Sequence, residues 1–152
     1  MIDSPRLMDI APQHTAVIRE RVPKQELSRF VPAACGEVWN FLRSAGIQGG
    51  RHMALYGDAS GMVEVGAEVA APFEGSERVQ CSSLPDGQVV AITHYGPYGS
   101  LGAAHEAIHT WCTEQGQESP QIFWEIYGHW EESWNADPSK IRTDIFYLLD
   151  GN

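Results

Sequence analysis

The sequence is poor in basic residues and has no long hydrophobic run. Lysine and arginine total 10 against 20 aspartate and glutamate in 152 residues, so the formal net charge is −10. Nucleic acids and anionic membranes are bound by clustered basic side chains, and this balance argues against both as partners. No apolar stretch approaches the roughly 20 residues of a membrane span. The N-terminus lacks the charged-then-apolar pattern of a secretory signal, and we therefore expect a cytoplasmic protein.

Cysteine is also scarce. The three cysteines, Cys35, Cys81 and Cys112, are widely spaced, and no C-x-x-C pair occurs. An odd number at such spacing does not indicate a disulfide framework. We expect reduced thiols with a structural role. Aromatic residues, in contrast, are well represented, with five each of tryptophan, tyrosine and phenylalanine.

Hydrophobic periodicity divides the chain into two similar halves. In each half a β-rich segment precedes an amphipathic helix, and two shorter strands follow it. The first half predicts a strand at 15–22, a helix at 32–45 that stops at Gly46, and strands at 53–56 and 62–69. The second half predicts a strand at 89–95, a helix capped by Ser100 and ended by Gly116, and strands at 122–127 and 143–149.

The two helices superimpose residue by residue, with His105 on Cys35 and Gly116 on Gly46. This similarity favours a duplicated βαββ unit. The sequence therefore predicts an α+β fold: an antiparallel sheet, two main helices on one face, and a ligand groove between pseudo-symmetric halves. An ordinary α+β domain with coincidental internal similarity is the alternative.

The same pattern suggests where the domain begins and ends. Residues 1–11 are expected to form an N-terminal extension, and residues 12–152 a single domain. The two repeats would span about 12–74 and 78–150, with the connection between them near 75–86.

The strand at 122–127 carries a carboxylate that the first half lacks. Alternation places Phe123, Glu125 and Tyr127 on one face and Ile122, Trp124 and Ile126 on the other. Because an unpaired buried charge is costly, we expect Glu125 on the open face, away from the helices. Asp144 and Phe146 of the last strand are expected to share that face. In the first half the position of Glu125 is taken by Ala54, which makes Glu125 a candidate site residue.

An acid among aromatic side chains has two chemical uses. It attracts a cation, and aromatic faces add attraction of roughly 0.5–2 kcal/mol for each contact. Alternatively, apolar surroundings raise the pKa of a glutamate toward neutrality and make it a general acid or base. A strand glutamate that is simply exposed to solvent remains the plain alternative.

The segment His105-Glu106-Ala107-Ile108-His109 matches the H-E-x-x-H motif of zinc proteases on a predicted helix. The longer metzincin motif is not completed, because Cys112 and Gln115 stand where its glycine and histidine would be. His105 also falls on the core-facing stripe of the helix. We interpret both histidines as core or boundary residues and expect no metal and no cofactor, with zinc as the alternative.

Several segments resemble one known family. They are Leu84-Pro85-Asp86-Gly87, His94-Tyr95-Gly96-Pro97-Tyr98-Gly99-Ser100-Leu101, Trp124-Glu125-Ile126-Tyr127 and Arg142-Thr143-Asp144-Ile145-Phe146. In this order they resemble the GyrI-like small-molecule-binding domain, which is also the effector-binding domain of BmrR-type multidrug-sensing transcription activators. The resemblance is strong over 84–149 and looser over 12–72, where Val63-Glu64-Val65-Gly66 is the best match.

The resemblance implies a duplicated βαββ fold that binds hydrophobic, often cationic compounds, with the family's buried glutamate at Glu125. Some GyrI-like proteins hydrolyse cyclopropane-bearing DNA-alkylating compounds, with such a glutamate assisting attack by water. Others protect gyrase. Only about a dozen residues precede the first predicted strand, so we expect a stand-alone form without the helix-turn-helix of the regulators.

These observations lead to one principal hypothesis and two alternatives. The principal hypothesis is a binding protein for small hydrophobic, cationic compounds. The alternatives are a hydrolase of cyclopropane-bearing electrophiles, with Glu125 as general acid or base, and a protein that protects gyrase or contacts a regulator. The expected ligand-binding residues are Glu125, Tyr127, Phe123, Phe146, Tyr95, Tyr56, Trp39 and Trp130.

Overall fold

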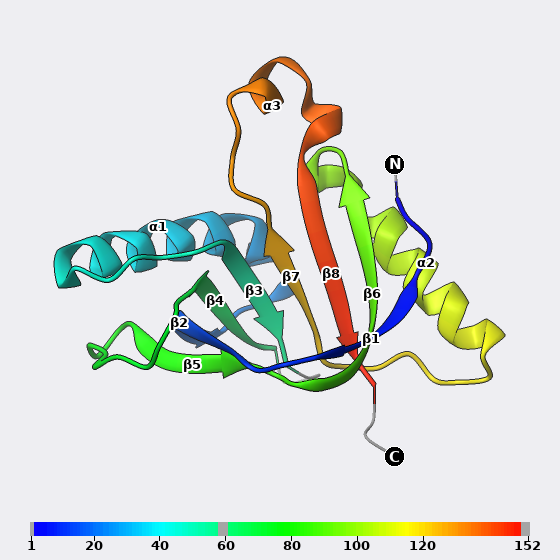
Figure 1. Ribbon diagram of the computed structural model, residues 1–152, viewed down its shortest axis with the longest axis horizontal. Helices are drawn as coiled ribbons and strands as arrows, with labels where there is room; N and C mark the ends of the chain where they lie inside the picture. The colour runs from blue at the N-terminus through cyan, green and yellow to red at the C-terminus, as the bar shows by residue number, and fades with distance from the viewer. Residues whose placement is uncertain (1, 58–60, 150–152) are drawn as a thin grey trace. The chain divides into compact units, whose positions relative to one another are not determined.

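The computed structural model describes residues 2–57 and 61–149, and Figure 1 shows their helices and strands. The chain forms two units. Residues Ala11–Asp86 make the first, here called the N-terminal unit. The second, here called the C-terminal unit, joins the chain from Gly87 onward to the segment that ends at Ile10.

The N-terminal unit is an antiparallel sheet with one long helix. Its strands lie in the order β3–β4–β2–β5. In chain order the elements are β2 (Gln13–Arg21), the 3-10 turn η1 (Lys24–Glu26), α1 (Leu27–Ala45), β3 (His52–Tyr56), β4 (Met62–Glu68) and β5 (Gln80–Leu84). Helix α1 packs on β2 and β4 through its buried residues Ala34, Val38 and Leu42.

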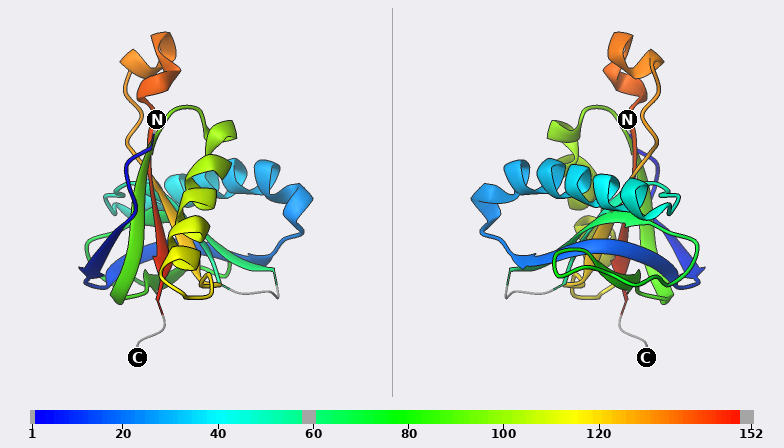
Figure 2. Two further views of the ribbon diagram at one scale, coloured as in Figure 1. Left: turned by 90° about the vertical axis from the view of Figure 1, so that its right-hand side faces the viewer. Right: turned by 90° about the vertical axis from the view of Figure 1, so that its left-hand side faces the viewer.

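The C-terminal unit repeats this arrangement. Its strands lie in the order β1–β6–β8–β7, and all of its pairs are antiparallel. Figure 2 shows α2 running along one face of β6 and β8. In chain order the elements are β1 (Arg6–Ile10), β6 (Gly87–Tyr95), η2 (Tyr98–Ser100), α2 (Gly102–Glu114), β7 (Phe123–Tyr127), α3 (Ser133–Ala136), η3 (Pro138–Lys140) and β8 (Arg142–Leu148).

The α+β class and the duplicated strand–helix–strand–strand plan are confirmed. The sequence did not predict the fourth strand of each sheet. Strand β1 lies within the expected N-terminal extension and pairs with β6, and β5 lies within the expected connection and pairs with β2. Both edge strands have mixed exposure along their length, so neither shows the clean hydrophobic alternation that identifies a strand.

Both long helices end where the sequence predicts. Gly46 and Gly116 each have φ of 71°, the left-handed conformation that terminates a helix and favours glycine. The starts differ from the prediction. Helix α1 begins five residues before Pro32, which lies inside the helix on its exposed side. Ser100 does not cap α2, because the N-cap position is taken by Leu101, and the Ser100 hydroxyl donates to the carbonyl of Pro97.

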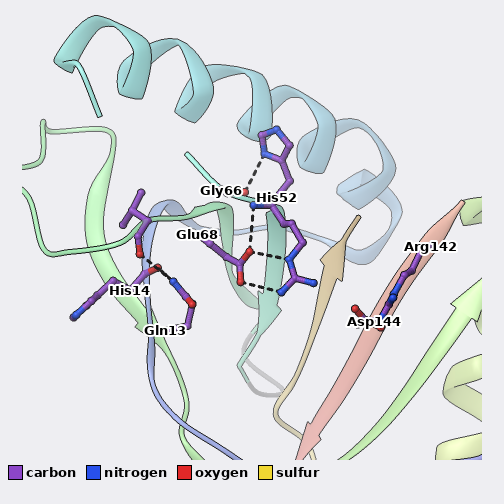
Figure 3. A network of polar contacts seen from close by, with 9 residues as sticks. Gln13, His14, His52, Gly66, Glu68, Arg142 and Asp144 are labelled. Carbon is purple, nitrogen blue, oxygen red and sulfur yellow. Dashed lines mark hydrogen bonds and ion pairs between the residues drawn. The ribbon is translucent and has the colours of Figure 1, made fainter. Parts of the chain in front are cut away.

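A polar cluster fixes one end of the N-terminal sheet (Figure 3). The Glu68 carboxylate accepts two hydrogen bonds from the Arg51 guanidinium, at 3.0 and 3.3 Å, and one from the Arg51 backbone. The His52 ring lies 3.2 Å from the carbonyl oxygen of Gly66. Because the carboxylate is bidentate and only partly exposed, this pair anchors β4 to the start of β3.

None of the helices in the described residues is both long and apolar enough to cross a membrane.

Candidate functional site

Glu125 lies at the centre of β7 and faces α2, contrary to the prediction. Cross-strand partners share a face, and Glu125 is paired with Ile145 of β8, which in turn is paired with Ile92 of β6. Ile92 and Ile145 belong to the core beneath α2. The prediction assumed that a buried carboxylate would lack partners. In the structure Glu125 is 8% exposed and has partners on both oxygens, so the predicted cost does not arise.

A chain of three hydrogen bonds passes through this carboxylate. The Tyr127 hydroxyl donates to Oε1 of Glu125 at 2.7 Å. Oε2 lies 2.7 Å from Nε2 of His105 on α2. The other ring nitrogen of His105, Nδ1, lies 2.7 Å from the hydroxyl of Tyr147 on β8. Residues of β7, β8 and α2 are thereby joined in one polar network beneath the helix.

The chemistry of Tyr147 assigns the protons in this network. Burial, and secondly the charge of Glu125, raise the pKa of the Tyr147 phenol. The phenol therefore keeps its proton and can donate it to Nδ1 of His105. In the neutral imidazole, Nε2 then carries the hydrogen and donates to Glu125. Every hydrogen bond in the chain points toward the Glu125 carboxylate.

Aromatic rings surround the network on the same face of the sheet. Phe123 and Tyr147 are stacked, with ring centroids 4.8 Å apart. The His105 ring meets Phe123 edge-on at 5.2 Å. Tyr127 meets Tyr98 of η2 edge-on at 5.7 Å. Phe123, Tyr127 and His105 are each partly exposed, whereas Tyr147 is buried.

The opposite face of this sheet carries a separate cluster. Asp144 accepts hydrogen bonds from Thr93 at 2.7 Å and from Arg142 at 3.3 Å. On the same face Trp124 stacks on Phe146, with ring centroids 5.6 Å apart. The expectation that Asp144 and Phe146 share a face with Glu125 is therefore wrong, as is the placement of Trp124 toward the helix. The register shows why, because Phe146 is paired with Trp124 and not with Glu125.

The structure brings only part of the predicted site together. Phe123 and Tyr127 share the face of Glu125. Tyr95 is paired with Arg142 and lies on the opposite face, and Trp130 is 53% exposed beside Trp134 in the segment after β7. Tyr56 and Trp39 belong to the N-terminal unit, where Trp39 contacts His52.

Sequence reasoning missed two members of the network. His105 was noted only as part of a metal motif or as a core residue, and Tyr147 was not considered. Alternation along β8 would have placed Tyr147 on the same face as Ile145. Only the strand register, however, shows which residues of β7 lie opposite these two. The histidines of the H-E-x-x-H segment have separate hydrogen-bond partners, because His109 contacts Ser119 at 2.7 Å. Among the described residues no group of three metal-ligating side chains gathers.

Residues 3–149 match the GyrI-like small molecule binding domain. No curated protein sequence matched the chain. Among solved structures, the C-terminal domain of EcmrR is 20% identical, with a TM-score of 0.77 and 97% of each chain covered. In the DNA complex of EcmrR, this chain spans 56% of the length of the regulator.

Two further structures share the fold. SAV2435 bound to tetraphenylphosphonium is 13% identical, with a TM-score of 0.65, and the match covers 98% of this chain and 95% of that one. A hydrolase from Listeria innocua is 11% identical, with a TM-score of 0.56, and the match covers 95% of this chain and 90% of that one. At these identities the structures establish a shared fold. Because the family match extends over nearly the whole sequence, the chain belongs to the GyrI-like small molecule binding domain family.

Proposed function

We propose that this domain binds small hydrophobic cations and that Glu125 supplies the counter-charge. The observation that carries the proposal is the burial of this carboxylate among hydrogen-bonding partners other than lysine or arginine. Glu125 is buried, and its partners are a tyrosine hydroxyl and an imidazole. No lysine or arginine of the described residues pairs with it.

An ionised carboxylate in this position places its negative charge in a poorly hydrated site. Neutral donors stabilise the charge through hydrogen bonds but do not cancel it. Desolvation strengthens its attraction for any cation that comes near. The rings of Phe123 and Tyr127 add apolar area and a favourable quadrupole for a flat or bulky cation. The site is therefore suited to a ligand that is both hydrophobic and positively charged.

Structural neighbours support the same ligand class. Tetraphenylphosphonium, seen with SAV2435, is a cation covered entirely by aromatic rings. EcmrR carries the same fold as the C-terminal domain of a DNA-binding protein. Phe146, Tyr95, Tyr56, Trp39 and Trp130 stay predictions as further ligand contacts.

The proposal is tested by titrating tetraphenylphosphonium into the protein by calorimetry. Replacing Glu125 with glutamine keeps the side-chain shape and removes the charge. We expect the Glu125→Gln variant to lose about 1–3 kcal/mol of binding free energy, as for a charged hydrogen-bonding partner. Glu106→Gln, on the exposed side of α2 next to His105, is the matched control and should bind like the wild type. Equal affinities for all three proteins would refute the role of Glu125.

A hydrolase that opens cyclopropane rings is the second candidate. The observation that favours it is the continuous path from Tyr147 through His105 to Glu125, which could deliver or accept a proton during attack by water. Product analysis after incubation with a cyclopropane-bearing alkylating compound tests this activity. Hydrolysis no faster than in buffer would exclude that substrate class, whereas a rate lost in Glu125→Gln would support it.

A further inference from the structure

Two buried polar atoms lie beside the Glu125 network without hydrogen-bond partners among the described residues. They are Nδ1 of His94 on β6 and Oγ1 of Thr143 on β8. His94 is 2% exposed and Thr143 is fully buried. Leaving such atoms unpaired costs roughly 1–3 kcal/mol each, so their presence calls for an explanation.

The surroundings of His94 fix which hydrogen-bonding role Nδ1 can play. The Ser100 hydroxyl uses its only proton on the carbonyl of Pro97, at 2.8 Å. Nε2 of His94 lies 3.0 Å from the same hydroxyl oxygen, and with the hydroxyl proton used on the Pro97 carbonyl we assign Nε2 as the donor in that contact. The neutral ring carries its hydrogen on Nε2, and Nδ1 is left with a bare lone pair. Burial lowers the pKa of His94, which is consistent with the neutral ring.

The two atoms lie on one row of the sheet, next to the Glu125 network. His94 is directly paired with Thr143, and Thr143 is directly paired with Tyr127. All three side chains therefore share the face of Glu125. Directly paired residues have Cβ atoms roughly 4.5–5.5 Å apart, so the two side chains are close enough to share one hydrogen-bonding partner once a small movement admits it. Tyr127 connects this row to the carboxylate through its 2.7 Å hydrogen bond.

Packing of the sheet does not require a hydroxyl at position 143. In the N-terminal unit Tyr56 is paired with Val63, as Tyr127 is with Thr143 in the C-terminal unit. The equivalent place thus carries valine, which has nearly the same shape as threonine and no polar atom. The hydroxyl of Thr143 is an addition that the fold itself does not need.

We propose that His94 and Thr143 form a hydroxyl-binding subsite, so that the domain prefers cationic ligands that carry a hydroxyl group. The ligand hydroxyl donates its hydrogen to Nδ1 of His94 and accepts one from Oγ1 of Thr143. This inference rests on the proposed function, because Glu125 binds the cationic part of the same ligand. A water molecule has the same hydrogen-bonding chemistry and is the competing occupant.

A matched pair of probes tests the subsite. The first is benzyl-dimethyl-(2-hydroxyethyl)ammonium, and the second is benzyl-dimethyl-propylammonium, in which a methyl group replaces the hydroxyl. By calorimetry we expect the wild type to bind the hydroxylated probe about 5- to 10-fold more tightly, the effect of one net hydrogen bond. Thr143→Val should abolish this preference and leave affinity for the propyl probe unchanged. Glu125→Gln should weaken both probes equally.

Each other outcome is decisive. If neither probe binds the wild type, the proposed function and the subsite fail together for this ligand class. If both bind equally and depend on Glu125, only the subsite is wrong. If Thr143→Val weakens both probes to the same extent, the row holds a structural water and the subsite is again wrong.

A stability measurement that needs no ligand gives a second test. Replacing Thr143 with valine removes an unpaired buried hydroxyl, so we expect the ligand-free variant to be as stable as the wild type or more stable. Thr93→Val is the matched control, because Thr93 is equally buried on the neighbouring strand but donates to Asp144 at 2.7 Å. That variant should be destabilised and keep the probe preference. A marked loss of stability in Thr143→Val would show an internal role for the hydroxyl and overturn the subsite.

Discussion

Removing the Tyr147 hydroxyl tests whether the buried network exists as described. Tyr147→Phe keeps the ring that stacks on Phe123 and contacts His109. The substitution therefore deletes one hydrogen bond and leaves the aromatic packing in place. What remains is a ring nitrogen of His105, Nδ1, that has lost its 2.7 Å partner beneath α2.

The size of the effect follows from how far water can compensate. A buried polar atom without a partner costs roughly 1–3 kcal/mol. The His105 side chain is 19% exposed, so limited hydration is available and the lower part of that range applies. We expect the free energy of unfolding to fall by about 1–2 kcal/mol. For a chain of this length that corresponds to a decrease in Tm of roughly 2–8 °C.

Urea unfolding followed by tryptophan fluorescence measures this change, and a double-mutant cycle assigns it. In a His105→Leu background the partner nitrogen is absent, so Tyr147→Phe should cost nothing further. Two results would refute the reasoning. Tyr147→Phe as stable as the wild type would mean that the hydrogen bond contributes nothing. An equal cost in both backgrounds would mean that the loss does not pass through His105.

Three further predictions concern titration, packing and thiol chemistry. Because burial lowers the pKa of His94, the unfolded chain takes up a proton at higher pH than the folded one. The free energy of unfolding should therefore fall as the pH drops below about 6.5. Urea titration measures this pH dependence, which should shrink in His94→Gln. Gly66→Ala should fail to give stable folded protein in a thermal melt, because an added Cβ would lie 1.8 Å from a carbonyl oxygen of β2; a normal Tm would contradict the described register. A thiol reagent should label the exposed Cys81 at once but Cys35 and Cys112 only in denaturant. The reason is that burial raises the pKa of Cys35 to about 12 and also raises the pKa of Cys112. Rapid labelling of a second thiol in the native protein would count against this burial.

The repeated core of the fold could be predicted from the sequence because its signals are local. An amphipathic stripe and a terminal glycine define each long helix, and β-rich segments define the inner strands. The edge strands β1 and β5 could not be found this way. They form because a neighbouring strand offers unpaired backbone groups, which the side chains of residues 6–10 and 80–84 do not reveal.

The site was predicted less completely, and for a different reason. Glu125 was identified from composition and alternation, but its face was predicted from the cost of a lone charge. That cost depends on residues distant in the sequence, since His105 lies 20 positions before Glu125. A periodic pattern cannot reveal which polar residues on different elements satisfy one another. Buried polar networks are therefore where local sequence rules fail first.

The two units differ in whether they carry this buried network. By strand register and helix superposition, the positions of His105, Glu125 and Tyr147 correspond to three small side chains in the N-terminal unit: Cys35, Ala54 and Ala67. A fold with this plan therefore packs well without these three polar side chains. A half-built network would leave an unpaired buried charge or ring nitrogen, which costs more than an apolar core. Since the complete set occurs in only one of two equivalent places, packing does not explain it. The proposed role of Glu125 in binding a cationic ligand would account for it.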